Sequence, residues 1–116
     1  NCRMFVLPSE VEGMSLSLLD AMAFGACTVS SDIAANVAVI GDAGRSFRVG
    51  DVSHLTEVLE DPLANPEQIT TLRSAARARI TAEFTWDAVA DRWVDLYDTV
   101  LEGQPALTAP VSNATV

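Results

Sequence analysis

Residues 12–23 of the 116-residue chain read EGMSLSLLDAMA, and they follow a short apolar run at residues 4–7 that Pro8 ends. This order predicts a strand, then a turn that contains an acid and a glycine, then a helix. In an open α/β sheet, ligands bind outside the carboxyl ends of the strands, beside the N-termini of helices. Residues 12–23 therefore predict a ligand-binding turn.

The turn before this helix has the properties of a phosphate-binding site. Gly13 has no side chain that would keep a ligand away from the backbone. The amides of residues 14–16 lie at the start of the helix, where N–H groups lack helical partners and the helix dipole favours an anion. Glu12 and Asp20 lie on either side, about 12 Å apart along the helix axis. An extended ligand can therefore meet one acid at each end and place its phosphates between them.

The same stretch also fits a simpler interpretation as a buried helix. Apolar side chains surround most of it, namely Leu16, Leu18, Leu19, Met22 and Ala23. That pattern is typical of a helix that is covered on most sides. A single Glu-Gly pair after a strand does not decide between the two, so the argument depends on motifs elsewhere in the chain.

Several such motifs follow in order. They are Pro-Ser-x-x-Glu-Gly at 8–13, Ala-Met-Ala-x-Gly at 21–25, Ser-Asp-Ile at 31–33, Gly-Asp-Ala-Gly at 41–44, Val-Gly-Asp at 49–51 and Phe-x-Trp-Asp at 84–87. Together, from residue 1 to about 102, they resemble the retaining GT-B glycosyltransferases of family 4, the glycosyl transferases of group 1. The resemblance implies an α/β fold with a partial Rossmann-like parallel sheet and flanking helices, as in the C-terminal part of a GT-B domain.

The resemblance also implies a role for each acid. In that family an acid-x7-acid motif places the first acid at the donor sugar and the second at the ribose of the nucleotide. Glu12 is then the candidate catalytic residue, which orients the sugar by its hydroxyls and is not assigned as a nucleophile. Asp20 takes the ribose role, although the family normally has the longer Glu there. The implied donor-binding residues are Glu12, Gly13, Met14, Ser15, Leu16 and Asp20.

The implied reaction is the transfer of a hexose from a nucleoside diphosphate sugar to an acceptor, with retention at the anomeric carbon. We expect no metal ion or other cofactor, because the sequence shows no clear metal-ligand cluster. In the family, an Arg and a Lys that clamp the diphosphate lie upstream of the matched segment. We therefore expect a fragment that is inactive alone and that depends on a missing N-terminal acceptor-binding domain. Contact of the parent protein with a membrane surface through that domain is left open.

Composition and charge restrict the other classes. Seven basic residues, all of them Arg, and 16 acidic residues give a net charge of −9, which disfavours nucleic acid as a partner. No apolar run reaches the roughly 18 residues of a membrane span, and no leader peptide is recognised, so we expect a cytoplasmic protein. The one histidine, His54, has no obvious acidic or nucleophilic partner and is interpreted as a surface residue.

The remaining sequence predicts the other elements of a parallel sheet. Strands are expected at residues 1–7, 26–30 and 45–49, with the first two parallel and the last at an edge. Helices are expected at residues 14–24, 34–40, 52–60 and 66–83, followed by a final helix from about residue 86 to 102. We assign residues 1–103 to the nucleotide-sugar-binding domain and expect residues 104–116 to be a disordered tail.

Three groups of side chains on these elements have competing interpretations. Ser31 and Asp32 are expected to cap the helix at residue 34, and contact with a ligand is the alternative. The arginines at positions 73, 77 and 79 are expected to form a solvated face, and an anion-binding groove is the alternative. The apolar stripe of the last helix, from Trp86 to Leu101, has core-facing spacing, although its end, from Tyr97 onward, could be exposed in this chain.

Two other functional interpretations remain open. The chain could be a non-catalytic nucleotide- or sugar-binding or packing domain of the same fold, as Asp20 and the pair Ala34-Ala35, where the family often has Pro-Glu, would allow. It could also be an unrelated flavodoxin-like domain in which residues 9–13 bind a different phosphate. Thermal protection by ligands separates the interpretations. A sugar nucleotide would stabilise the glycosyltransferase domain, a flavin would stabilise the flavodoxin-like domain, and no ligand would stabilise a packing domain.

Overall fold

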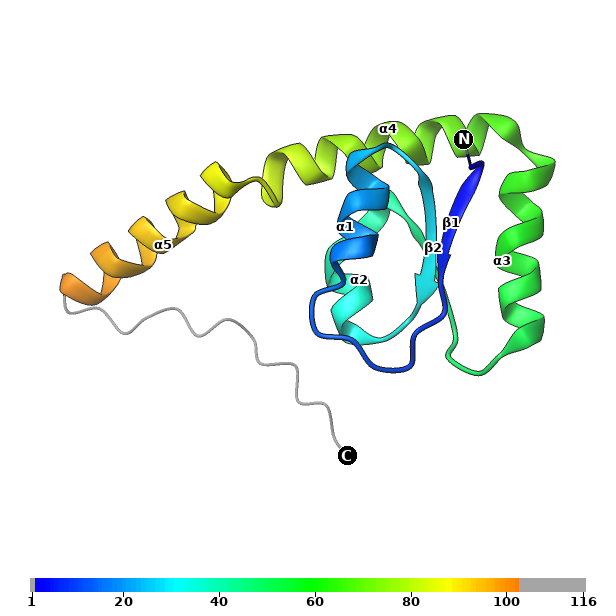
Figure 1. Ribbon diagram of the computed structural model, residues 1–116, viewed down its shortest axis with the longest axis horizontal. Coiled ribbons are helices and arrows are strands. Elements are labelled where there is room, and N and C mark those ends of the chain that lie inside the picture. The colour runs from blue at the N-terminus through cyan, green and yellow to red at the C-terminus, as the bar shows by residue number, and fades with distance from the viewer. Residues whose placement is uncertain (1, 103–116) are drawn as a thin grey trace.

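The computed structural model describes residues 2–102, in which three strands form one parallel sheet (Figure 1). The strands are β1 (Met4–Leu7), β2 (Cys27–Ser31) and β3 (Arg45–Phe47), in the order β1-β2-β3. Met4 lies opposite Cys27 in the first pair, and Val29 lies opposite Arg45 in the second. Because the strands are parallel, their carboxyl ends meet at one edge of the sheet. The predicted α/β fold with a partial Rossmann-like parallel sheet is confirmed.

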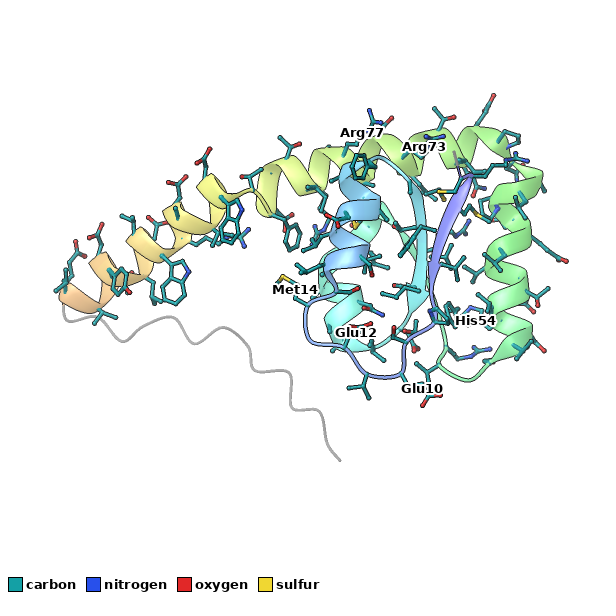
Figure 2. All side chains as sticks on the ribbon, viewed as in Figure 1. Glu10, Glu12, Met14, His54, Arg73 and Arg77 are labelled. Carbon is teal, nitrogen blue, oxygen red and sulfur yellow. The ribbon has the colours of Figure 1, made fainter. Side chains whose placement is uncertain are left out.

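Five α-helices and one 3-10 turn accompany the sheet. They are α1 (Leu16–Ala23), α2 (Ala34–Ile40), η1 (Gly41–Ala43), α3 (Val52–Ala64), α4 (Pro66–Glu83) and α5 (Trp86–Leu101). Helices α1 and α2 cover one face of the sheet, and α3 lies on the other side (Figure 1). Helix α4 runs along the edge where the strands begin, with Arg73 and Arg77 on it (Figure 2). None of the helices within residues 2–102 is long and apolar enough to cross a bilayer.

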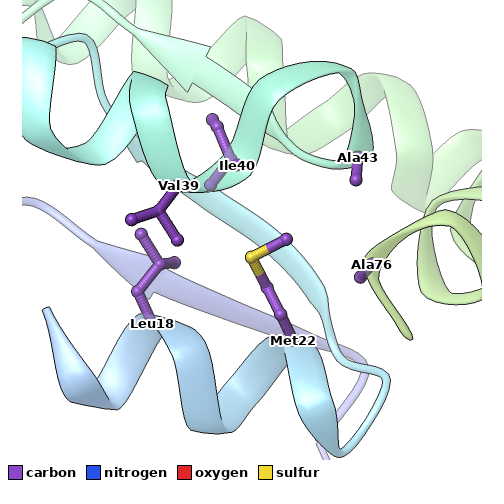
Figure 3. Close-up of a cluster of buried hydrophobic side chains, with 6 residues drawn as sticks. All are labelled: Leu18, Met22, Val39, Ile40, Ala43 and Ala76. Carbon is purple, nitrogen blue, oxygen red and sulfur yellow. The ribbon is translucent and has the colours of Figure 1, made fainter. Parts of the chain in front are cut away.

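The core lies between the sheet and helices α1 and α2, and α4 closes one end of it. Its fully buried members are Leu18, Met22, Val39, Ile40, Ala43 and Ala76 (Figure 3). Strand β2 is buried along its whole length because it has a neighbour on each side. Strand β1 has one neighbour in the described sheet, and Val6 is 37% exposed. The prediction of a fully buried strand over residues 1–7 is therefore wrong in length and in burial.

Helix α1 ends as its sequence predicts, in a glycine turn. The N–H of Gly25 donates to Met22 O at 2.9 Å, and the N–H of Ala26 donates to Ala21 O at 2.8 Å. These two bonds form a Schellman motif, which requires a left-handed residue, and Gly25 has a φ of 69°. The chain is thereby turned directly from α1 into β2.

The arginines of α4 are solvated as predicted, since Arg73 and Arg77 are exposed and Arg79 is half-buried, but they also have backbone partners that were not predicted. Their guanidinium groups donate to carbonyls at the end of α2 and just beyond the end of α1, near the negative ends of the helix dipoles. Arg79 also makes an ion pair with Glu83 on the same helix, at 2.8 Å. The backbone contacts are Arg73 Nε to Gly25 O (2.6 Å), Arg77 Nη2 to Phe24 O (3.0 Å), Arg79 Nε to Val39 O (2.7 Å) and Arg79 Nη2 to Ala38 O (3.0 Å). These bonds hold α4 against the ends of both helices.

The junction between α3 and α4 is shorter than predicted. We expected a loop at residues 61–66, but α3 continues through Pro62 to Ala64, and Asn65 alone separates the helices. The N–H of Asn65 donates to Asp61 O at 3.1 Å and closes the last turn, while the buried ring of Pro62 packs inside the fold. Arg45 of β3 donates a hydrogen bond to Asp61 and fixes this turn against the strand. The same hydrogen bond holds the pKa of Asp61 below its usual value.

Helix α5 differs most from its prediction. It extends beyond the sheet (Figure 1), and none of its residues is buried. Trp86 is 88% exposed and Trp93 is 54% exposed, so the core-facing interpretation is wrong for the first part of the helix, whereas exposure from Tyr97 onward agrees with the sequence analysis. Thr85 caps the start of the helix, because its Oγ1 accepts the N–H of Ala88 at 3.2 Å. The predicted tail at residues 104–116 lies outside the described residues.

Substitution of Gly25 tests the contact between α1 and α4. Gly25→Ala and Gly50→Ala both place a side chain at a left-handed φ, 69° and 74°, which costs about 1–2 kcal/mol. A Cβ at Gly25 would lie 2.2 Å from Arg77 Nε, whereas at Gly50 it would meet no atom within 4 Å. Arg77 must then move and lose its bond to Phe24 O, so Gly25→Ala should cost about 1 kcal/mol more.

Urea unfolding of the two variants and of Gly25→Ala/Arg77→Ala measures this difference. Measured against Arg77→Ala alone, Gly25→Ala in the double variant should show little or none of the extra cost, because the bond to Phe24 O is already absent and no arginine is present to be displaced. Equal losses of unfolding free energy in the two single variants would contradict the contact.

Candidate functional site

The loop that joins β1 to α1 lies at the carboxyl edge of the sheet and contains most of the predicted site. Figure 2 shows Glu12 in this loop, near the start of α1. Its side chain is half-buried, whereas Gly13 and Met14 are exposed. A Cβ built on Gly13 would meet nothing within 4 Å. The space beside the backbone is therefore open, as the ligand-binding interpretation requires.

The N-terminus of α1 begins later than the sequence predicted. Ser15 is the N-cap, and its hydroxyl pairs with Ser17 Oγ at 3.0 Å and makes no capping bond to an amide. The first bond to the helix runs from Leu19 N to Ser15 O, so the amides of residues 16–18 have no acceptor within the helix. The predicted set was residues 14–16. An anion here would meet the amides of residues 16–18, two residues closer to Asp20.

A series of hydrogen bonds holds the Glu12 loop to the interior of the protein. Ser9 Oγ donates to Glu12 Oε1 at 2.7 Å, and the carbonyl of Ser9 accepts from Ser31 Oγ at the end of β2. Ser31 Oγ in turn accepts from Asn36 Nδ2 of α2 at 3.0 Å. We call this series the Asn36–Ser31–Ser9–Glu12 relay. Sequence reasoning missed it, because its members come from three separate segments.

The two residues that were expected to cap α2 have other partners. Ile33 is the N-cap of that helix, and no side chain caps it. Ser31 belongs to the relay, and Asp32 Oδ1 accepts the N–H of Val49 at 3.0 Å, just beyond β3. The capping prediction is therefore wrong for both residues, because β2 extends to Ser31 and brings these side chains to neighbouring segments of the sheet edge.

Asp20 lies in different surroundings from Glu12. It is exposed on α1 and lines a cavity of about 420 Å³ together with Ser17 and Arg73. Phe5 and Phe24 supply much of the apolar wall of this cavity, and Glu12 does not line it. The structure therefore places both acids along the α1 segment, as the spacing requires, but it does not bring them into a common cavity.

The carboxyl edge of the sheet is acidic. Glu10 and Glu12 lie there (Figure 2), and Asp51 follows β3. The N–H of His54 and the guanidinium of Arg48 donate to Asp51 and hold its pKa below the usual value. His54 Nδ1 also accepts the N–H of Arg48 at 3.0 Å. The histidine and this arginine therefore secure a turn, and Arg73 and Arg77 lie at the opposite edge (Figure 2).

Comparison with known proteins relates the chain to enzymes that transfer sugars. The family model described as "Glycosyl transferases group 1" matches residues 1–65. The chain is 35% identical over 98 residues to an MMP alpha-(1->4)-mannosyltransferase of Mycolicibacterium hassiacum, covering 82% of this chain. It is 32% identical over 110 residues to a glycogen synthase of Mycobacterium tuberculosis, covering 91% of this chain.

A solved structure extends the likeness to the fold. A sucrose-phosphate synthase from Thermosynechococcus elongatus superposes with a TM-score of 0.73 and 26% sequence identity, and the match covers 88% of this chain. In each case the chain spans about a quarter of the other protein: 24% of the mannosyltransferase, 27% of the glycogen synthase and 26% of the sucrose-phosphate synthase.

Removal of the Ser31 hydroxyl tests whether the relay stabilises the loop. Ser31→Ala leaves the buried amide of Asn36 and the carbonyl of Ser9 without their partner, and should lower the free energy of unfolding by about 1–3 kcal/mol. The adjacent Ser30 is a matched control, because it is fully buried and its hydroxyl has no partner among the described residues.

Ser30→Ala removes the same oxygen atom without breaking a bond and should be neutral or slightly stabilising. Chemical denaturation measures both changes. A loss in Ser30→Ala as large as that in Ser31→Ala would show that packing, and not the relay, is responsible.

Proposed function

Because this chain belongs to the group 1 glycosyltransferases and has the parallel sheet of a GT-B domain, we propose that it binds a nucleoside diphosphate sugar as donor. In the longer protein of which we propose it is part, a hexose passes from this donor to an acceptor with retention at the anomeric carbon. Residues 1–103 then belong to the nucleotide-sugar-binding domain, and an N-terminal domain binds the acceptor. The names of the relatives, which include mannosyltransferases and glycogen synthases, support sugar transfer.

One observation carries this proposal: a fixed carboxylate lies beside unpaired helix amides. Ser9 holds Glu12 by its Oε1 atom, and the amides of residues 16–18 have no helical acceptor. Sugar transfer from a nucleoside diphosphate requires stabilisation of the departing diphosphate and orientation of a sugar whose anomeric carbon gains positive charge. The amides of α1 would accept the phosphate oxygens, and Glu12 would accept hydroxyl groups of the sugar.

Asp20 would bind the ribose hydroxyls. It follows the last unpaired amide by two residues on the same helix, and the cavity that it lines contains the hydroxyl of Ser17. Its side chain is one methylene shorter than glutamate, so the ribose must approach α1 more closely than it would approach a Glu. The proposal includes no metal ion, and the cations for the diphosphate would come from the rest of the longer protein.

A second candidate function is a non-catalytic nucleotide- or sugar-binding or packing domain. The observation that favours it is the separation of the acids, because the cavity beside Asp20 does not include Glu12. In that case nucleotide binding could persist without any preference for the sugar-bearing form, or no ligand would bind.

Calorimetric titration of the longer protein with UDP-, GDP- and ADP-hexoses, and with the free nucleoside diphosphates, tests the proposal. Glu12→Ala should lower the affinity for the sugar nucleotide by about tenfold or more and leave the affinity for the free nucleotide nearly unchanged, because it removes hydrogen-bond acceptors for the sugar alone. Asp20→Ala should lower the affinity for both ligands. Glu10→Ala is the matched control, because Glu10 is an exposed acid of the same loop, and its loss should leave both affinities nearly unchanged.

The proposal fails if no donor binds the longer protein at millimolar concentration. Binding of nucleotides without any effect of Glu12→Ala would instead support the non-catalytic domain. A flavin that protects the protein from heat, with no effect of sugar nucleotides, would contradict both candidates.

A further inference from the structure

We infer that Ser9 is the positioning residue of Glu12, and that Ser31 and Asn36 hold Ser9 in place from inside the protein. This inference rests on the proposed function, in which Glu12 contacts the donor sugar. It assigns to the Asn36–Ser31–Ser9–Glu12 relay a role in recognition of the sugar, in addition to its role in stability.

The first step concerns the carboxylate itself. An ionised glutamate only accepts hydrogen bonds, and its two oxygens together offer about four acceptor positions. Ser9 Oγ occupies one position on Oε1 at 2.7 Å. Among the described residues, the structure gives this carboxylate no ion pair. Ser9 therefore fixes the orientation of Glu12 and leaves acceptor positions available for sugar hydroxyls.

The second step concerns the backbone of the loop. Ser9 is separated from Ser31 by 22 residues in sequence, yet its carbonyl accepts a hydrogen bond from the Ser31 hydroxyl. This bond fixes the peptide from which the Ser9 side chain projects. Without this bond, the loop would be held only at its two ends, by β1 and α1. Ser9 and Glu12 could then move together out of the site while keeping their own hydrogen bond.

The third step concerns the buried end of the relay. Ser31 is 1% exposed and Asn36 is fully buried, and Asn36 Nδ2 donates to Ser31 Oγ at 3.0 Å. Because Ser31 Oγ accepts this hydrogen bond, its own hydroxyl proton points to the carbonyl of Ser9. A hydroxyl alone could rotate to another acceptor, so the amide of Asn36 sets the direction of the whole relay.

Comparison with Ser30 shows that Ser31 is not explained by packing alone. The two residues are adjacent on β2 and equally buried, but the hydroxyl of Ser30 has no partner among the described residues. Burial of a hydroxyl costs free energy unless it is hydrogen-bonded. At Ser31 that cost is offset by two bonds, one of which reaches the Glu12 loop.

The test is a double-mutant cycle in the longer protein, with the sugar nucleotide and the free nucleoside diphosphate as ligands. Ser9→Ala should lower the affinity for the sugar nucleotide by about five- to tenfold and the affinity for the free nucleotide by less than about twofold. Ser9→Thr keeps the hydroxyl and should restore most of the affinity. In a Glu12→Ala background, Ser9→Ala should have no further effect, because its partner is already absent.

Ser31→Ala extends the test to the buried end, with Ser30→Ala as its control. Ser31→Ala should reduce affinity for the sugar nucleotide selectively, as Ser9→Ala does, and Ser30→Ala should not. Thermal melting of each variant confirms that the folded protein is being titrated.

Two results would overturn the inference while leaving the proposed function intact. One is an equal loss of affinity for both ligands in Ser9→Ala, which indicates a loop that is only structural. The other is full additivity of Ser9→Ala and Glu12→Ala. If Glu12→Ala itself leaves the affinity for the sugar nucleotide unchanged, the proposed role of Glu12 fails first, and the inference fails with it.

Discussion

Parallel pairing of β1, β2 and β3 is the constraint on which the rest of the structure depends. It places the N-termini of α1 and α2 at the carboxyl edge of the sheet and their C-termini at the opposite edge. The two edges therefore differ in electrostatics, because unpaired amides collect at one and unpaired carbonyls at the other. At the carbonyl edge, the guanidinium groups of Arg73, Arg77 and Arg79 take the last carbonyls of both helices. At the amide edge, α1 has no side-chain cap, and its amides remain available.

This separation explains where the positive charge of the chain is used. Three of its seven arginines lie on α4 and bind backbone carbonyls at the C-terminal ends of α1 and α2. Arg45 pairs with Asp61, and Arg48 pairs with Asp51. The sequence suggested either a solvated face or an anion-binding groove for the arginines of α4, and neither idea included backbone acceptors. Their acceptors are backbone carbonyls 40 or more residues away in sequence, which no spacing rule along one helix can reveal.

The same distinction between local and long-range signals decides what could be predicted. Helix α4 has the predicted bounds because Asn65-Pro66 is a local start signal, and α1 ends at Gly25 because a Schellman turn requires a left-handed residue. The sequence also predicts Glu12 at the end of β1 from a motif within one loop. It could not predict the relay, since Ser9, Ser31 and Asn36 meet only after β1 and β2 pair. Nor could it predict the exposure of the first part of α5, because helical periodicity shows that a face is apolar but not whether anything in the chain covers it.

The charge of the carboxyl edge bears on how the proposed donor would bind. A diphosphate placed at the start of α1 would meet unpaired amides, but it would also approach the acidic loop of Glu10 and Glu12 (Figure 2), and the chain as a whole carries a net charge of −9. Amide dipoles at a helix end supply only about half a positive charge, which does not neutralise a diphosphate together with these carboxylates. Arg48 cannot supply the rest while it is paired with Asp51 at 2.8 Å. On the proposed function, this segment therefore supplies the acids that orient sugar and ribose, and the longer protein must supply the cations that make the diphosphate stable beside them.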